Sequence, residues 1–227
     1  MVPRAALLLQ YSMYLRILRQ LLITLQALSL LPLALAPGVR MDTLLDKLHQ
    51  DHVNISRLLD ILEEQVQRYG KGETPDYPLI VDILRYMEDY PDTVHHPRED
   101  MMFARMREHG VDMEMETILR DLEEQHRDLR EKSLNFLEAL RGDLSAIAVP
   151  REAIERHGIA YLEAHRSHVD MEESRVFPAA KRMLDEKDWI ALDRSVSERE
   201  DPLFGAVVTR VYQSLYEHLV ERFEKAH

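Results

Sequence analysis

Histidines stand at core positions in four successive segments of this chain whose apolar residues repeat with helical periodicity. In the first segment His52 lies between Leu48 and Ile55, where the spacing calls for an apolar side chain, and His126 interrupts the third segment in the same way. Burying an imidazole without a hydrogen-bonding partner costs on the order of several kcal/mol. A chain that buries a histidine in each of four helices must therefore provide partners that offset this cost.

The apolar periodicity predicts four long helices joined by short loops. The first should begin after Asp42, a favourable N-cap residue, and the second near Pro78, because proline suits the first turn of a helix. Pro91 and Pro97 should bend the second helix, since each removes a backbone hydrogen bond. No strand pattern competes, so we expect an all-α fold, an antiparallel up-down-up-down four-helix bundle over residues 41–184. The expected helices span residues 42–70, 78–108, 114–141 and 151–184.

Residues 185–227 should form a C-terminal helical extension that packs on the bundle. A short helix is expected around Trp189 and a longer one after Pro202. The apolar stripe of the longer helix would comprise Leu203, Phe204, Val207, Val211, Leu215 and Leu219.

Residues 1–40 differ in kind, because they contain four arginines and no acidic residue. The apolar run Leu21–Ala36 follows two of these arginines as in a signal peptide, but Pro37 would follow the cleavage site and generally blocks cleavage. The run is also shorter than the ~20 residues that a membrane-spanning helix needs. Three interpretations stay open: sequence translated upstream of a true start at Met41, a signal peptide, or a membrane anchor.

Two of the four core histidines are followed by a glutamate four residues later. His95 precedes Glu99, and His168 precedes Glu172. Residues four apart lie on one face of a helix, so each pair offers an imidazole nitrogen and a carboxylate to one place. A single pair of this kind is commonly a surface feature, but four deviations on four successive core faces predict a metal site. Its expected ligands are His52, His95, Glu99, His126, His168 and Glu172.

The kinds of donor in this set restrict the metal. The chain has no cysteine, which excludes disulfides, thiolate-bound zinc and cysteine nucleophiles. Four imidazoles and two carboxylates exceed what one tetrahedral zinc ion takes, and they suit two ions bridged by both glutamates. We therefore expect two non-haem, carboxylate-bridged iron ions in the core of the bundle, with manganese as the alternative.

For other polar residues near these positions, the sequence leaves two alternative roles open. His96 and Asp100 are also four residues apart, and on a regular helix this pair would face about 100° away from the ligand pair beside it. We therefore expect His96 to support a ligand or to face the solvent. His49 and His165 each precede a predicted ligand by three residues. We expect each of them to be either an extra ligand or a hydrogen-bond donor to a ligand. Tyr161 either lines the cavity of the site or belongs to the apolar core.

The four helices resemble those of the haemerythrin-like (HHE cation-binding) family over residues 41–184. The similarity is carried by the stretches LLDKLHQDHVNISRLLDILE, YPDTVHHPREDMMFARM, LEEQHRDL and YLEAHRSHVDMEESRVFP. The family's metal ligands fall on the same six positions as the ligands expected above. Haemerythrins outside a six-ligand bacterial branch carry one more histidine, four residues after the position of His126. This chain has Arg130 there, so the sequence resembles the six-ligand bacterial branch. Members of that branch implicated in repair of nitrosatively damaged iron centres carry a cysteine-bearing amino-terminal domain, whereas this sequence contains no cysteine.

The resemblance implies a non-haem di-iron protein that binds or senses oxygen or nitric oxide, or handles iron. The alternative is a di-iron enzyme that acts on nitric oxide or peroxide, or in iron-centre repair. We favour binding because the sequence shows no dedicated general base beyond the metal ligands. The net charge of -12, without a basic patch that contains aromatic residues, argues against nucleic acid as a partner. We expect a cytoplasmic protein, with a membrane as partner only if residues 1–40 belong to it.

Overall fold

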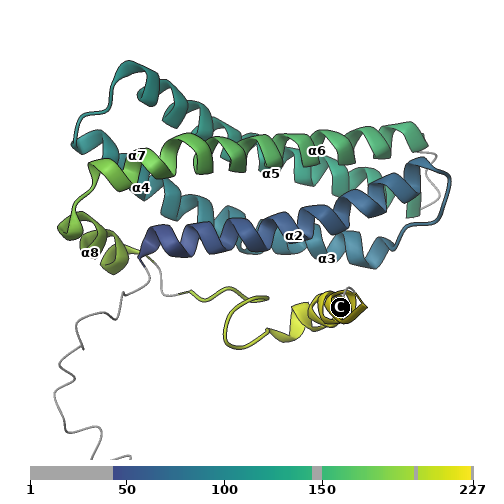
Figure 1. Ribbon diagram of the computed structural model, residues 1–227. Helices are drawn as coiled ribbons and strands as arrows, with labels where there is room; N and C mark the ends of the chain where they lie inside the picture. The colour runs from purple at the N-terminus through teal and green to yellow at the C-terminus, as the bar shows by residue number, and fades with distance from the viewer. Residues whose placement is uncertain (1–42, 145–149, 197–198, 226–227) are drawn as a thin grey trace, which may run out of the picture. The chain divides into compact units, whose positions relative to one another are not determined.

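The computed structural model describes residues 43–144, 150–196 and 199–225, and within these residues the protein is all-α (Figure 1). Four long helical segments lie antiparallel, with α2 and α5 both packed against α6. The second and fourth segments are each interrupted by a wide turn of π-helix. In chain order the bundle consists of α2 (Leu44–Gly70), α3 (Tyr77–Asp89), α4 (His96–Glu108), α5 (Met113–Leu144), α6 (Arg151–Met171) and α7 (Phe177–Met183). The predicted all-α bundle is therefore confirmed.

Local hydrogen bonds fix where the first helices begin. Thr43 caps α2 through a capping box: its hydroxyl accepts from the Asp46 N–H at 3.3 Å, and the Asp46 carboxylate accepts from the Thr43 N–H at 3.0 Å. Asp76 caps α3 by accepting from the N–H of Leu79 at 3.1 Å. Asp42, which we predicted as the first cap, lies outside the described residues, as does the whole of the segment 1–40.

The bends predicted for the second helix prove to be a turn of π-helix, and the fourth helix has another. These turns span Pro91–His95 and Glu172–Val176. The residue after each turn, His96 or Phe177, donates its N–H to a carbonyl five residues back instead of four. A proline follows each of these two residues, and a regular helix would bring its ring against the carbonyl four residues earlier. The wide turn relieves that clash, and such turns are frequent at functional sites.

The apolar core of the bundle is divided into two clusters with a polar layer between them. Leu48 and Phe103 belong to one cluster, and Ile55 and Tyr161 belong to the other. His52 lies between Leu48 and Ile55 along α2 and is itself only 2% exposed. The periodicity therefore located the core correctly, and the histidines mark a polar layer within it.

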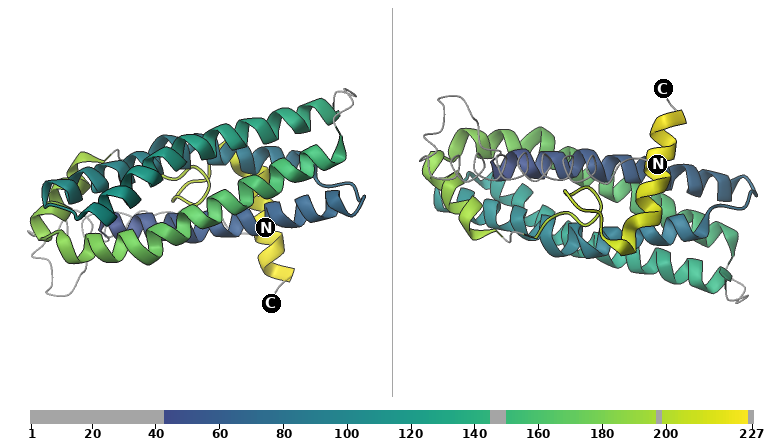
Figure 2. Two further views of the ribbon diagram at one scale, coloured as in Figure 1. Left: turned by 90° about the horizontal axis from the view of Figure 1, so that it is seen from above. Right: turned by 90° about the horizontal axis from the view of Figure 1, so that it is seen from below.

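The C-terminal extension differs in part from its prediction. Helix α8 (Glu186–Ser195) contains Trp189, as expected, but the longer helix α9 (Gln213–Lys225) begins well after Pro202. It lies across the bundle and contacts α3 (Figure 2). A 3-10 turn, Arg210–Tyr212, precedes it directly.

The predicted apolar stripe of this longer helix is wrong in its first part. The carboxylate of Asp201 accepts from the N–H groups of Leu203 and Phe204 at 2.8 and 2.9 Å and holds them in a turn. Val207 and Val211 are 74% and 59% exposed. Two short-range hydrogen bonds that the Asp201 carboxylate accepts thus hold a turn where the apolar spacing favoured a helix.

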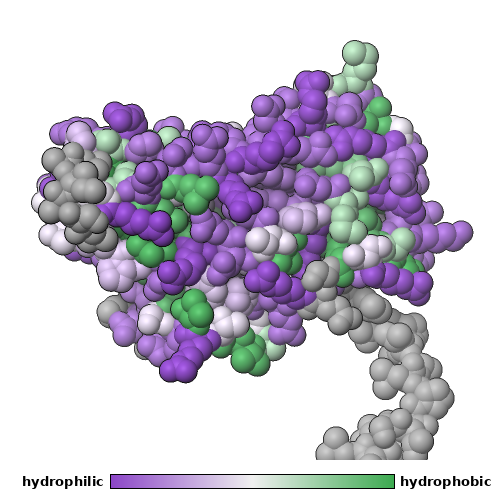
Figure 3. Space-filling view, turned by 180° about the vertical axis from the view of Figure 1, so that it is seen from behind, coloured by the Kyte–Doolittle hydropathy of each residue, from purple (hydrophilic) through white to green (hydrophobic). Residues whose placement is uncertain are grey.

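Figure 3 shows one face of the molecule, which is mainly hydrophilic with isolated apolar residues. Within the described residues, none of the helices combines the length and the apolar character that crossing a membrane requires.

Candidate metal centre

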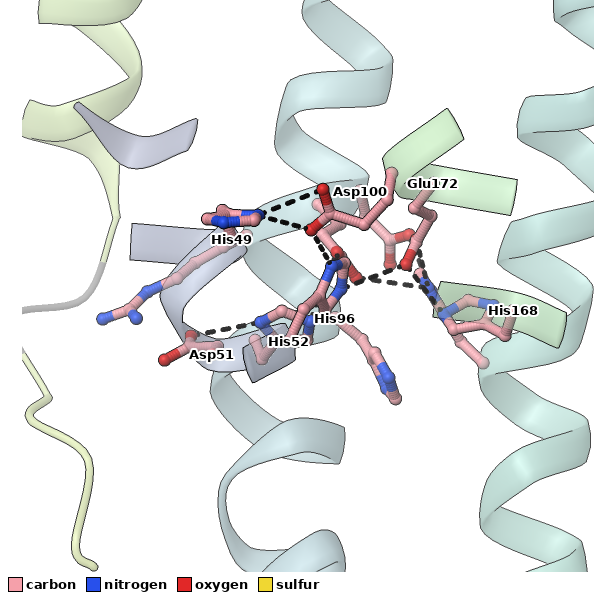
Figure 4. A network of polar contacts seen from close by, with 12 residues as sticks. His49, Asp51, His52, His96, Asp100, His168 and Glu172 are labelled. Carbon is pink, nitrogen blue, oxygen red and sulfur yellow. Dashed lines mark hydrogen bonds and ion pairs between the residues drawn. The ribbon is translucent and has the colours of Figure 1, made fainter. Parts of the chain in front are cut away.

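The six predicted ligands meet in the polar layer of the bundle. Figure 4 labels three of them, His52, His168 and Glu172. One comes from α2, one from α5, and a histidine and glutamate pair comes from each of the two interrupted helices. None of the six is more than 9% exposed, and both glutamates are fully buried. They are His52, His95, Glu99, His126, His168 and Glu172.

Glu99 lies at the middle of this cluster and offers its two oxygens to different histidines. Its Oε1 is 3.3 Å from Nε2 of His52 and 3.2 Å from Nε2 of His95. Its Oε2 is 3.5 Å from Nε2 of His126. The carboxylate therefore reaches toward two places at once.

Glu172 faces Glu99 from the fourth helix and is arranged similarly. Its Oε2 is 3.3 Å from Nε2 of both His52 and His168, and its Oε1 is 3.7 Å from Nε2 of His126. The two glutamates thus share His52 and His126 as neighbours, so that all six side chains converge on one small volume.

The atoms at the centre of this volume have donor or acceptor capacity that the protein does not use. Within the part of the chain that the structure describes, both oxygens of Glu99 and of Glu172 are buried without a hydrogen bond, and so are the Nε2 atoms of His52, His126 and His168. Leaving so many buried polar atoms unpaired is costly, and such atoms are normally hydrogen-bonded. Imidazole nitrogens and carboxylate oxygens that face one another in this way fit a metal ion.

The other ring nitrogen of each histidine predicted as a ligand is held by a side chain from a neighbouring helix. Nδ1 of His95 lies 3.1 Å from Oδ2 of Asp51 on α2, and Nδ1 of His52 lies 2.8 Å from Oε1 of Glu173. Such contacts fix the ring orientation and leave Nε2 free to face the centre.

The remaining two histidines predicted as ligands are also held through Nδ1. Nδ1 of His126 lies 3.1 Å from Oδ1 of Asp100, and Nδ1 of His168 lies 3.2 Å from Oε1 of Gln125. Each acceptor directly adjoins a ligand in the sequence but serves the histidine of the next helix, and Glu173 returns to the first helix. We call Asp51, Asp100, Gln125 and Glu173 the acceptor ring.

The family described as Hemerythrin HHE cation binding domain matches residues 43–180. The chain belongs to the haemerythrin family. No curated protein and no solved structure gave a significant match. The resemblance inferred from the four histidine-bearing helices is confirmed for the family, and membership of its six-ligand branch stays a prediction.

The charged members of the acceptor ring raise the pKa values of their histidines in this haemerythrin. Burial by itself lowers the pKa of His95, but Glu99 and Asp51 outweigh burial and raise it to about 9. Burial also opposes the charged form of His126, yet its partners, Asp100 first among them, raise its pKa to about 10. In the metal-free protein these imidazoles therefore hold protons at neutral pH, which a metal ion has to displace.

The pKa of His168 is shifted in the opposite direction. Burial lowers the pKa of His168, and the charges of His126 and His52 lower it further, although Glu172 and Glu99 oppose them. The acceptor at Nδ1 of His168 is the neutral amide of Gln125 and adds no charge to this balance.

The structure excludes the solvent-facing alternative for His96 and its expected pairing with Asp100. His96 is only 3% exposed, and Asp100, its expected partner, contacts His126 instead. Nδ1 of His96 lies 3.4 Å from Oδ1 of Asp92. The π-turn that ends at His95 breaks the regular helical angle on which the prediction relied, so two successive histidines both face the interior.

His49 and His165, left open between ligand and supporting roles, are placed differently from each other. The side chain of His49 is 61% exposed and its Nδ1 lies 2.9 Å from Oε1 of Glu173, so His49 supports the acceptor ring from outside. His165 is 2% exposed, and neither of its ring nitrogens has a hydrogen bond among the described residues. It stacks on Tyr161, which belongs to the apolar core.

Proposed function

We propose that this haemerythrin holds two iron ions through His52, His95, Glu99, His126, His168 and Glu172, and that it binds or senses oxygen or nitric oxide, or handles iron. The observation that carries the proposal is the set of buried, unpaired donor atoms that face one another between two apolar clusters. Membership of a cation-binding family supports the same conclusion.

Two ions are favoured over one by the way in which Glu99 divides its oxygens. Oε1 faces His52 and His95, whereas Oε2 faces His126 from the other side. One group of potential ligands contains His52, His95 and Glu99, and a second contains Glu99 with His126 and His168. A carboxylate that belongs to both groups suits a bridge between two ions.

The residues of the centre orient and enclose the metal. The acceptor ring fixes the imidazoles, and the ring of Phe177 stacks on His52 with centroids 5.1 Å apart. When bound, iron would supply affinity for small diatomic molecules and the capacity to exchange electrons with them. We favour a binding or sensing role because the histidines and carboxylates of the centre are assigned to holding the metal or to orienting its ligands.

Iron content tests the proposed number of ions. Protein reconstituted with Fe²⁺ without oxygen should contain close to two iron ions per chain by plasma emission spectroscopy, because the ligands form two groups that share Glu99. His52→Ala and His126→Ala should each lower that ratio. A ratio of one that neither substitution changes would contradict the dinuclear arrangement.

Rapid mixing tests the proposed ligands. Reduced, iron-reconstituted protein should change its near-ultraviolet and visible absorption within the first turnover on mixing with oxygen or nitric oxide, because one group of potential ligands offers its ion only two imidazoles, from His52 and His95. A matched sample reconstituted with Zn²⁺ should remain unchanged. An inert iron form would exclude gas binding and leave iron handling, and continued consumption over many turnovers would favour the enzyme.

A further inference from the structure

His96 lies within the metal centre although it belongs to none of the positions expected to bind metal. Each of His96, Glu99, His126 and His168 places a potential ligand atom within 4.8 Å of the others. The His96 ring also stacks on that of His126, with centroids 4.2 Å apart and planes 10° from parallel. Figure 4 shows His96 among the residues of the centre.

We propose that His96 is a fifth imidazole ligand, which binds the same metal ion as His126 and His168. The proposal rests on the function proposed above, because it assumes that the cluster holds metal. It assigns three imidazoles to one ion and two, from His52 and His95, to the other.

The orientation of His96 resembles that of the expected ligand histidines. Its Nδ1 faces the carboxylate of Asp92, just as the ligand histidines use Nδ1 to contact the acceptor ring. His96 is thereby held through one nitrogen and can offer the other to a metal ion. The Asp92 carboxylate is also close enough to Arg130 for the arginine's charge to oppose the rise in pKa that burial causes at Asp92.

The backbone explains how two adjacent histidines can serve two different ions. His95 ends the π-turn and contacts Glu99 on the side of His52, whereas His96 begins α4 and stacks on His126. The backbone bond from His96 N–H spans five residues, which changes the rotation between this turn and the next. An irregular helix thus places at this ion an imidazole that haemerythrins outside the six-ligand branch take from the position of Arg130.

His165 provides the matched comparison, because among the residues that the structure describes it is the other buried histidine outside the six predicted ligands. It is as buried as His96, but its ring is 6.3 Å from that of His168 between centroids, and it joins neither group of potential ligands. No hydrogen bond orients it among the described residues. Burial alone therefore does not make a histidine a ligand here.

The test counts ligand imidazoles in protein loaded with Co²⁺. A paramagnetic cobalt ion shifts the proton resonance of the N–H on each bound imidazole far outside the normal range. Wild-type protein should show one such exchangeable resonance for each of His52, His95, His96, His126 and His168. His96→Phe, which keeps an aromatic ring on His126, should lose one resonance, whereas His165→Phe should lose none.

Metal affinity gives a second readout. In a competition titration with a chelator, His96→Phe should weaken one of the two Co²⁺ equivalents by at least about 10-fold and leave the other close to wild type. His96→Gln should behave in the same way, with the helix content of both variants checked by circular dichroism.

Each outcome separates this proposal from the one on which it rests. Four shifted resonances in wild type would show that His96 is not a ligand, even if neither variant folds, and would leave the metal centre intact. Loss of a resonance in His165→Phe would likewise overturn the assignment to His96. Failure of wild-type protein to take up cobalt or iron would overturn both proposals.

Discussion

Iron should raise the melting temperature of this haemerythrin by about 8–16 °C when free iron exceeds the dissociation constant 1,000-fold. That concentration stabilises the folded state by about 4 kcal/mol, and 1 kcal/mol shifts the melting temperature of a chain of this size by about 2–4 °C. The physical reason is that buried, unpaired donor atoms of Glu99, Glu172 and three histidines gain partners only when metal binds. Differential scanning calorimetry of chelated and anaerobically loaded protein measures the increment.

Glu99→Ala and Glu172→Ala should each remove most of this increment. The quantity to compare is the difference between loaded and metal-free protein for each variant, because deleting a buried carboxylate changes the metal-free protein as well. Glu163→Ala, which removes an exposed carboxylate from α6, should keep the full increment. If chelated and loaded wild-type protein melt together, the converging side chains are not metal ligands.

The sequence predicts those features of the fold and of the candidate site that depend on one side chain or on the spacing within one helix. A histidine such as His52, placed between Leu48 and Ile55, reveals both the helical face and the polar layer that crosses the core. The pairs His95 with Glu99 and His168 with Glu172 need only the four-residue spacing of a helix. These features depend on local periodicity, which is readable without knowledge of neighbouring helices.

The features that the sequence conceals depend on the backbone or on other helices. The π-turn before His96 was visible only as two prolines, and a regular helix placed that histidine on the wrong face. The stripe after Pro202 was misread because Asp201 forms hydrogen bonds with the backbone and starts a turn. Local hydrogen bonds of this kind compete with apolar periodicity, and their outcome depends on the surrounding contacts.

The acceptor ring was also missed, although its sequence signal is simple. Asp51, Asp100, Gln125 and Glu173 each stand beside a predicted ligand in the sequence. The sequence led to no prediction for Asp51, Gln125 and Glu173, and Asp100 was paired with His96, because residues next to a ligand on a helix point in a different direction from it. In the bundle, each one instead reaches the histidine of the next helix, so that four local pairs become one closed set of contacts.

Substitution of the acceptor ring should weaken iron binding by about 10–100-fold without removing a ligand. Glu173→Ala should have this effect because Glu173 holds Nδ1 of His52 at 2.8 Å. Glu173→Gln should lose less, since a neutral amide already serves His168 through Gln125. Chelator competition gives the affinities, and Asp170→Ala, an exposed carboxylate nearby on α6, is the matched control.

Different members of the acceptor ring should orient the ligands of different ions, so each substitution should weaken the binding of one ion more than that of the other. Asp51 and Glu173 hold His95 and His52, which share one group of potential ligands. Asp100 holds His126, which belongs to the other group. Asp51→Ala and Glu173→Ala should therefore weaken the same iron equivalent, and their double variant should leave the second equivalent close to wild type. Asp100→Ala should show the opposite selectivity. Equal weakening of both equivalents by every variant would mean that the ring stabilises the bundle as a whole and does not orient individual ligands.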